Sequence, residues 1–207
     1  GDTIVKYKMY NYLRHQERSL EIYPELNVID IDNYLEPDEY LEGTGSLVLD
    51  RINKIAYASI SNRTSSSAVH LWCKKMNYTP VIFNSSYRSG EPVYHTNIAL
   101  SIGTRFAVVC LDVIDNKDVT RVVKSIENSG KSIINISEEQ LHSYCGNILE
   151  LKGHHEYVLM SETALQSFDY NSRSKLESLG LGIVALNIPY IEHVYGGGIR
   201  CMIAEKF

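Results

Sequence analysis

Residues 196–202 (GGGIRCM) join a reactive side chain to an unusually open stretch of backbone. Three successive glycines let a chain approach a ligand closely, or adopt positive φ angles, at little steric cost. Cys201 stands at the far end of this turn, where we expect a strand to begin, and Arg200 beside it favours the nucleophilic thiolate form. The segment predicts covalent chemistry at Cys201. By itself it leaves open the alternative that the turn is ordinary and that Cys201 only packs.

Three other segments place polar side chains at the ends of expected strands. His95, in residues 93–97 (VYHTN), can act as a general acid and base because the pKa of histidine lies near neutral pH, although a lone histidine is more often structural. Glu42 precedes two glycines at the mouth of a strand, and Arg63 offers a partner for a carboxylate between a strand and a helix. Each signal is weak alone, but their shared placement at strand ends indicates a common site.

Composition and charge exclude several classes of protein. The 207 residues are 44% hydrophobic and 22% charged, which is typical of a globular domain. Twenty basic against 25 acidic side chains give a net charge of −5, so no basic face for nucleic acid is expected. No apolar run approaches the roughly 18 residues of a membrane span, and the N-terminus lacks a signal-peptide pattern. We therefore expect a cytoplasmic protein that binds neither nucleic acid nor membrane.

Cysteine and histidine spacing argues against metal sites and disulfides. The four cysteines form no CxxC pair, and the only close histidine pair is His154-His155, which we expect at an exposed hairpin turn. Cys73, Cys110 and Cys145 are expected to be buried as small hydrophobic side chains. The 15 tyrosines form no stripe of their own and are expected to pack in the core and at its rim.

The elements that must position the polar residues repeat along the chain with a period of about 50 residues, which is typical of propellers and arrays. Three strand-strand-helix-strand units are expected, at 46–50, 54–60, 66–76 and 79–83; at 97–102, 105–111, 116–128 and 131–136; and at 147–151, 156–160, 171–178 and 181–187. A partial unit precedes them, with a strand at 3–7, a helix at 11–22 and a strand at 27–31, and a last strand is expected at 202–205.

The repeats predict a single α/β domain over residues 1–207, because no Pro/Gly/Ser-rich linker separates them. A ring of such units needs its two ends to meet, since an open sheet edge invites aggregation. Three full units and fragments fall short of a closed ring. We therefore expect an N-terminally incomplete domain that lacks about one blade.

Five segments, in this order along the chain, together resemble the guanidino-group-modifying, or pentein, superfamily: residues 41–46 (LEGTGS), 61–64 (SNRT), 94–97 (YHTN), 146–151 (GNILEL) and 196–202 (GGGIRCM). That superfamily includes arginine deiminases, dimethylarginine hydrolases and amidinotransferases. The closest resemblance is to the bacterial citrulline-utilisation hydrolases, often labelled amidinotransferase-like, and it runs through the whole chain. It implies a five-bladed α/β propeller of ββαβ units around a central channel.

Residue by residue, the resemblance makes Cys201 the nucleophile, His95 the general acid and base, and Glu42 the carboxylate that grips the substrate's terminal nitrogens. It places Arg63 near the substrate's α-carboxylate, and Asn147 is expected to line the channel at the start of a strand. The substrate would be a small amino acid, and neither a metal nor an organic cofactor is implied. Family members also carry an acidic residue in an N-terminal segment that this sequence does not contain.

Asn97 departs from the family pattern in a way that bears on the substrate. Deiminases that act on a cationic guanidinium usually show His-x-Asp, whereas the third position here is an amide that donates, accepts and carries no charge. A neutral ureido group suits an amide better than a guanidinium, which prefers carboxylates. We therefore expect a hydrolase that converts citrulline to ornithine, ammonia and carbon dioxide through an S-linked intermediate.

Several alternatives stay open on the sequence alone. An arginine deiminase or a dimethylarginine hydrolase would use the same residues, and an amidinotransferase would pass the intermediate to an amine. A propeller of this kind can also be a non-catalytic binding module, because architecture does not prove function. Assembly into a homo-oligomer is likewise left open.

Overall fold

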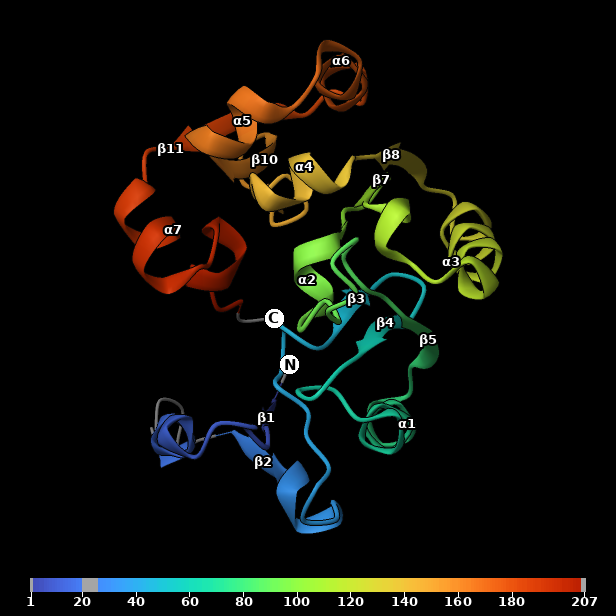
Figure 1. Cartoon of the computed structure of the whole chain (residues 1–207), viewed down its shortest axis with the longest axis vertical. Coiled ribbons are helices and arrows are strands. Elements are labelled where there is room, and N and C mark those ends of the chain that lie inside the picture. The colour runs from blue at the N-terminus through green and yellow to red at the C-terminus, as the bar shows by residue number, and fades with distance from the viewer. Residues whose placement is uncertain (1, 20–25, 206–207) are drawn as a thin grey trace.

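The computed structural model describes residues 2–19 and 26–205, and three small sheets follow one another around a common centre (Figure 1). Each sheet and its crossover helix form one ββαβ unit, as the repeats predict. The units consist of β3 (Val48–Asp50), β4 (Ile55–Ile60), α1 (Ser66–Met76) and β5 (Thr79–Asn84); β6 (Leu100–Ile102), β7 (Phe106–Val109), α3 (Asn116–Asn128) and β8 (Ser132–Asn135); and β9 (Leu149–Lys152), β10 (Glu156–Ser161), α6 (Tyr170–Ser178) and β11 (Gly182–Leu186).

Within each unit the strand order is the same. The first two strands pair antiparallel across a short turn, and the third returns parallel to the second after the helix. A parallel return requires such a crossover, so α1, α3 and α6 lie on the outer rim (Figure 1). The first strands β3, β6 and β9 contact one another in turn and line the centre.

A smaller unit precedes these three. Strands β1 (Thr3–Lys6) and β2 (Asn27–Asp30) pair in parallel, and the 3₁₀ helix η2 (Ile31–Tyr34) follows. The helix expected at 11–22 is the 3₁₀ helix η1 (Tyr12–Ser19), and residues 20–22 of that expected range lie outside the described residues. This unit carries η1, whose residue Arg14 joins the site below.

The structure corrects two expected strands. Residues 97–99 belong to the short helix α2 (Thr96–Ala99), because the Thr96 hydroxyl donates to Ser46 O at 2.6 Å and accepts from Ser59 N at 2.8 Å. These contacts hold residue 96 against the first unit, so β6 begins only at Leu100. The last strand, expected at 202–205, is wrong: η4 (Ile199–Met202) is a 3₁₀ helix, and residues 203–205 follow without regular structure.

Four further short helices escaped the periodicity analysis: η3 (Leu111–Val113), α4 (Glu138–His142), α5 (Glu162–Ser167) and α7 (Pro189–Tyr195). Two of them carried recognisable start signals. Ser137 and Gln140 form a reciprocal capping box before α4, and Pro189 occupies the first turn of α7. No described helix is long and apolar enough to cross a membrane.

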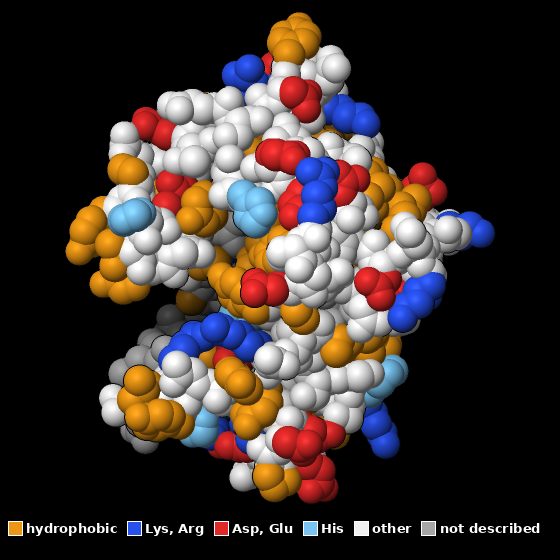
Figure 2. All heavy atoms as spheres, viewed as in Figure 1, with side chains coloured by type: hydrophobic (Ala, Val, Ile, Leu, Met, Phe, Trp, Pro, Cys, Tyr) orange, Lys and Arg blue, Asp and Glu red, His pale blue; other side chains and the backbone are white. Residues whose placement is uncertain are grey.

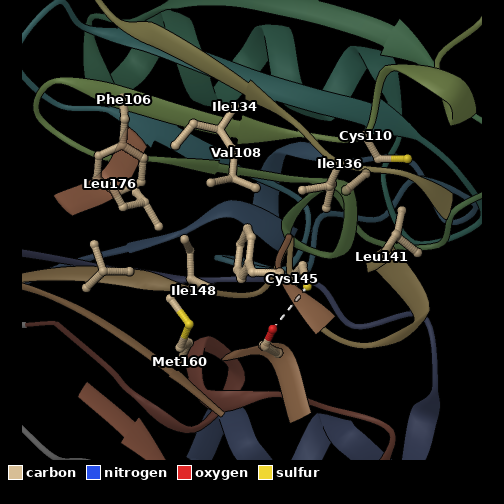
Figure 3. Packing of buried hydrophobic residues seen from close by; sticks show 14 of the residues in the cluster. Phe106, Val108, Cys110, Ile134, Ile136, Leu141, Cys145, Ile148, Met160 and Leu176 are labelled. Atoms are coloured by element: carbon tan, nitrogen blue, oxygen red, sulfur yellow. Dashed lines mark hydrogen bonds between the residues drawn. The ribbon is translucent and has the colours of Figure 1, made fainter. Parts of the chain in front are cut away.

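The apolar core lies between neighbouring units. Strand β7 shows the principle: Phe106 and Val108 face the third unit, whereas Ala107 and Val109 face the first, because successive strand residues point to opposite faces. Figure 3 shows the cluster that joins the second and third units, with Phe106 and Val108 at one side and Met160 at the other. Two of the three apolar clusters therefore join neighbouring units, and the third packs β4 against α1 within the first unit.

The expectations for three cysteines and for the histidine pair are confirmed. Cys73, Cys110 and Cys145 are buried, and the Cys145 thiol donates to Ala164 O at 3.4 Å (Figure 3). His154 and His155 are exposed in the turn between β9 and β10. Among the described residues, no group of three His, Cys, Asp or Glu side chains could hold a metal ion.

A buried ion pair joins the first two units and provides a stability test. The Lys131 ammonium lies 2.8 Å from the Asp50 carboxylate, and the two side chains are 1% and 2% exposed. Because removal of one partner leaves the other charge buried and unpaired, Lys131→Met should lower the free energy of unfolding by about 3–5 kcal/mol. Urea denaturation followed by the fluorescence of the single tryptophan measures this change.

The matched control is the exposed pair of Lys117 and Asp115, where Lys117→Met should change the same free energy by less than about 1 kcal/mol. Burial raises the pKa of Asp50. The positive charge of Lys131 and the hydrogen bonds from Lys131 and Asn53 outweigh the effect of burial, and they hold the pKa below its ordinary value. The stabilisation should thus be present above pH 3.8 and disappear as the pH falls further. Equal losses in the two lysine variants would contradict the prediction.

Candidate active site

One cavity of about 620 Å³ collects most of the residues that the sequence singled out. His95, Asn97, Asn147, Cys201 and Arg63 all line it. They come from α2, from the loop before β9, from η4 and from the 61–64 turn, so the ring of units brings together segments far apart in the chain. Figure 2 shows the hollow between α7 and the N-terminal unit, with basic side chains at its edge.

Cys201 is the exposed cysteine of the chain, and the glycine turn explains how it reaches the cavity. Gly196 ends α7 in the left-handed conformation, with φ of 65°, which favours glycine. At Gly198 a Cβ atom would lie only 2.7 Å from Asn147 Oδ1, so only glycine lets η4 pack against that amide. Gly196 thus serves the backbone conformation and Gly198 the packing, and the turn presents the thiol to the cavity.

Two amide groups face the sulfur. Asn147 Nδ2 lies 3.3 Å from Cys201 Sγ, and Asn97 Nδ2 lies 3.9 Å from it. Asn147 Nδ2 also donates to the backbone oxygen of Asn97 at 3.0 Å, which ties the Asn147 side chain to the backbone of α2. N–H donors hydrogen-bond a thiolate more strongly than a neutral thiol, because the acceptor is then charged.

Arg200 does not take the place that the sequence suggested. Its guanidinium points away from the thiol, with Nη2 2.7 Å from Glu205 Oε2 and Nη1 donating to Ile203 O at 3.0 Å. Its backbone N–H donates to Asn147 Oδ1 at 3.1 Å. Arg200 therefore anchors η4 and Asn147, and the amides rather than the guanidinium are the groups next to the sulfur.

Glu42 lies behind His95 and not on the cavity wall. Its Oε2 atom is 2.8 Å from His95 Nε2, 3.2 Å from Arg14 Nη1 and 3.6 Å from Arg63 Nη1, while Oε1 accepts from Tyr10 N at 2.8 Å. Burial raises the pKa of Glu42, but these hydrogen bonds and positive charges outweigh it and bring the pKa below its ordinary value. The carboxylate is therefore an anion that orients His95.

The sequence resemblance gave Glu42 a different task, which was to hold the substrate's terminal nitrogens. In the structure its side chain is 1% exposed, and donors of the protein itself occupy both oxygens. The role in gripping substrate thus stays a prediction, whereas the contact with the imidazole is a direct feature of the fold.

Arg14 is a cavity residue that the sequence analysis missed. It lines the cavity from η1, and together with Arg63 it brackets Glu42. Arg63 in turn lies over the Tyr94 ring, with Cζ 4.8 Å from the ring centroid. No motif surrounds Arg14 in the sequence, so only the packing of the N-terminal unit against the centre reveals it.

Four tyrosines also line the cavity, although the sequence suggested only packing roles: Tyr87, Tyr94, Tyr144 and Tyr195. Tyr87 stacks on His142, with the ring centroids 5.2 Å apart. Burial raises the pKa of Tyr87 to about 12, so its hydroxyl stays protonated at neutral pH. The cavity therefore combines a thiol, two imidazoles and two guanidinium groups with an aromatic lining.

Comparison with solved structures identifies the fold. The N-terminal domain of ArgZ bound to substrate, an arginine dihydrolase from cyanobacteria, has a TM-score of 0.77 at 16% identity, with 97% of this chain and 69% of that chain covered. Apo ArgZ has a TM-score of 0.76 at 15% identity, with 98% and 30% covered. DDAH from Pseudomonas aeruginosa in complex with citrulline has a TM-score of 0.61 at 16% identity, with 95% and 67% covered.

These likenesses confirm the pentein propeller, and the chain spans less than a third of full-length ArgZ. No curated protein gives a significant match to the sequence. The family model that matches, over residues 1–207, is that of eukaryotic N,N dimethylarginine dimethylhydrolase, whereas the sequence resemblance had pointed first to citrulline hydrolases within the same superfamily. The chain belongs to the N,N-dimethylarginine dimethylhydrolase family of the pentein superfamily.

Proposed function

We propose that this chain forms the site of a cysteine-dependent hydrolase that cleaves a C–N bond in the ureido or guanidino group of an arginine-like amino acid. The observation that carries the proposal is the shared cavity: the Cys201 thiol and the His95 imidazole line it together, and a buried carboxylate orients the imidazole. A nucleophile, a general acid and base, and an orienting group are the parts that covalent catalysis requires.

The reaction has two half-reactions. The Cys201 thiolate bonds to the planar carbon of the substrate, the C–N bond breaks, and His95 gives a proton to the departing amine. Water then bonds to the same carbon, the S–C bond breaks, and His95 takes a proton from the water. Citrulline would give ammonia, then a carbamate that decomposes to ornithine and carbon dioxide. Arginine would give ammonia and citrulline, and dimethylarginine would give dimethylamine and citrulline.

The charges around the cavity favour a ureido group, and we put citrulline first. The charged side chains that line it are Arg14 and Arg63, and no aspartate or glutamate belongs to the described lining. Beside the sulfur, a cationic guanidinium would meet the neutral amides of Asn97 and Asn147 and no carboxylate of the described lining. The two arginines suit the α-carboxylate of the substrate, because a guanidinium forms bidentate pairs with carboxylates.

Dimethylarginine is the second candidate, because the matching family model is that of its hydrolase. The four tyrosines that line the cavity agree with this alternative, since aromatic rings accept methyl groups and cations. Arginine is the third candidate, because ArgZ is described as an arginine dihydrolase.

The deciding experiment gives the protein each of the three amino acids and identifies the products by mass spectrometry. Ornithine from citrulline would support the first candidate, and dimethylamine from dimethylarginine the second. A parallel reaction with glycine present separates hydrolysis from transfer, since an amidinotransferase would produce a modified glycine. Absence of product from all three amino acids would overturn the proposed function.

Gly45 supplies a test of the imidazole's position. A Cβ atom at this residue would lie 2.7 Å from both Nδ1 and Cε1 of His95, so the ring packs directly on the glycine backbone. Gly45→Ala must therefore displace the ring, and kcat should fall by about 10²-fold because misplacement by about 1 Å has that effect. KM should change little, since the substrate-facing arginines stay in place.

Steady-state kinetics with the best substrate measures this prediction. Gly153→Ala is the matched control, because the nearest atom to a Cβ there is 3.9 Å away and the turn is exposed. Equal kcat values for the two glycine variants would show that the contact between Gly45 and His95 does not position the ring.

A further inference from the structure

Tyr144 holds a backbone conformation that a bulky residue rarely adopts. It follows α4 with a φ of 64°, in the left-handed region. Its N–H donates to Leu141 O at 3.0 Å, and the next N–H, of Cys145, donates to Gln140 O at 3.1 Å, which is the Schellman pattern that ends a helix. Glycine is the usual residue at this position, because a side chain there is strained.

Four other described helices end with a left-handed residue, and each uses glycine or asparagine. Gly130, Gly180 and Gly196 follow α3, α6 and α7 with φ of 77°, 76° and 65°, and Asn77 follows α1 with φ of 56°. Asparagine tolerates this conformation because its short polar side chain can form local hydrogen bonds. Strain at a large residue persists only where surrounding contacts fix it, and such positions cluster at functional sites. The side chain of Tyr144 should therefore have a task of its own.

The Tyr144 side chain connects its loop to α7. Tyr144 lines the active-site cavity, and its hydroxyl donates to Glu192 O in α7 at 2.9 Å. The same carbonyl accepts from Gly196 N at 3.1 Å, which is the bond that ends α7, and a carbonyl oxygen has two lone pairs for the two donors. Thr163 Oγ1 in α5 donates to Glu192 Oε2 at 2.7 Å, so the side chain of Glu192 is held as well. The hydroxyl thus fixes the point at which the glycine turn begins.

The far end of the glycine turn is held by the same loop. Asn147, three residues after Tyr144, accepts from Arg200 N at 3.1 Å through Oδ1, and its Nδ2 lies 3.3 Å from Cys201 Sγ. Between these two anchors the turn packs on the cysteine itself, because a Cβ atom at Gly197 would lie 3.2 Å from Cys201 Cβ. One loop therefore holds the segment that carries the thiol at both of its ends.

We propose that Tyr144 is a positioning residue for the nucleophile: its hydroxyl fixes the end of α7, so that the glycine turn presents Cys201 Sγ to the substrate beside Asn147. The loop is a firm base, because Gly146 packs on Ile98 O with no room for a side chain. The kinetic consequence of this inference rests on the proposed function, whereas the structural consequence can be measured without substrate.

The test is Tyr144→Phe, which removes the hydroxyl and keeps the ring on the cavity wall. We expect kcat with the best substrate to fall about tenfold, because the net contribution of one hydrogen bond corresponds to about that factor. KM should stay unchanged, because Arg14 and Arg63 keep their places. Hydrogen exchange followed by mass spectrometry should show exchange in residues 193–202 about tenfold faster than in the wild type, with the rest of the chain unchanged.

Tyr57→Phe is the matched control. Tyr57 is buried, its hydroxyl lies 3.1 Å from Ser125 Oγ, and it stands outside the cavity lining. This variant loses a hydrogen bond of the same kind, but kcat and the exchange of residues 193–202 should match the wild type.

Tyr144→Gly is a second variant that separates positioning from a role in ending α4. Glycine suits the left-handed position, so a residue that only ended the helix could be replaced by glycine without loss of activity. We expect kcat of Tyr144→Gly to fall at least as far as that of Tyr144→Phe, because both variants lack the hydroxyl that reaches α7.

Wild-type kcat in either Tyr144 variant would overturn the inference, and so would unchanged hydrogen exchange in Tyr144→Phe. A rise in KM with unchanged kcat would also overturn it, because the hydroxyl would then bind the substrate. Equal losses in Tyr57→Phe would reduce the result to a general effect on stability and overturn it too. If the wild type turns over none of citrulline, arginine and dimethylarginine, the proposed function fails, and hydrogen exchange alone still decides whether Tyr144 holds the turn.

Discussion

Replacement of Cys201 by serine should lower turnover by about 10⁴-fold or more, because the nucleophile that forms the covalent intermediate is lost. Asn97 and Asn147 face the sulfur with their amide nitrogens, and a serine hydroxyl at the same place has no base within the described contacts to activate it. Cys201→Ala should lose activity to the same extent. The measurement is product formation under conditions of enzyme excess, together with mass spectrometry of the protein.

The same cysteine should be the only one that reacts with iodoacetamide in the folded protein. Cys73, Cys110 and Cys145 are buried, and burial raises the pKa of the first two to about 11 and of the third to about 12. Native protein should therefore take up one label, and Cys201→Ser none. Cys110→Ala is the control variant and should keep the label. Turnover by Cys201→Ser close to that of the wild type would disprove the assignment of the nucleophile.

Glu42→Gln should lower kcat by about 10³-fold to 10⁴-fold, because the residue that orients a catalytic histidine loses its charge while its shape is retained. In the wild type one carboxylate serves His95, Arg14 and Arg63 at the same time, with distances of 2.8, 3.2 and 3.6 Å. A neutral amide can accept from His95, but it leaves the two guanidinium groups without their anion and adds N–H donors among them.

The pH dependence of stability gives an independent readout of Glu42. Its pKa in the folded protein is below the ordinary value of 4.5, so its contribution is present above that pH and is lost as the pH falls through the folded-state pKa. Thermal unfolding should therefore show a smaller loss of stability below pH 4.5 in Glu42→Gln than in the wild type. Glu36→Gln, on the exposed part of the same loop, should behave as the wild type does. Identical acid profiles for the wild type and Glu42→Gln would contradict the ion cluster.

The two glycine-rich segments show what can be predicted from the local sequence alone. The glycines at 43, 45 and 196–198 indicated places where the backbone could approach a ligand or another part of the chain closely. The structure supplies the neighbour in two cases: Gly45 supports the His95 ring, and Gly198 makes room for Asn147. Sequence could point to these positions because the absence of a side chain is a local property. It could not name the partners, which come from other units.

The final segment shows where local reasoning failed. The sequence suggested a strand at residues 202–205, yet η4 ends at Met202, residues 203–205 have no regular structure, and Arg200 pairs with Glu205. A strand needs a neighbour to accept its hydrogen bonds, and the presence of that neighbour is a property of the assembled ring. The same reason explains α2, where contacts of Thr96 with the first unit override the strand tendency of residues 97–99.

What the sequence determined by itself was the ββαβ repeat, the superfamily and the residues able to do chemistry, because periodicity and motifs are encoded over short stretches of chain. Only the tertiary structure decided which of those residues meet. It paired Glu42 with His95, set Asn147 beside Cys201, turned Arg200 away from the thiol and brought Arg14 to the cavity. Such contacts depend on the packing of one unit against the next, so they are fixed by strand register and core shape and not by spacing along the chain.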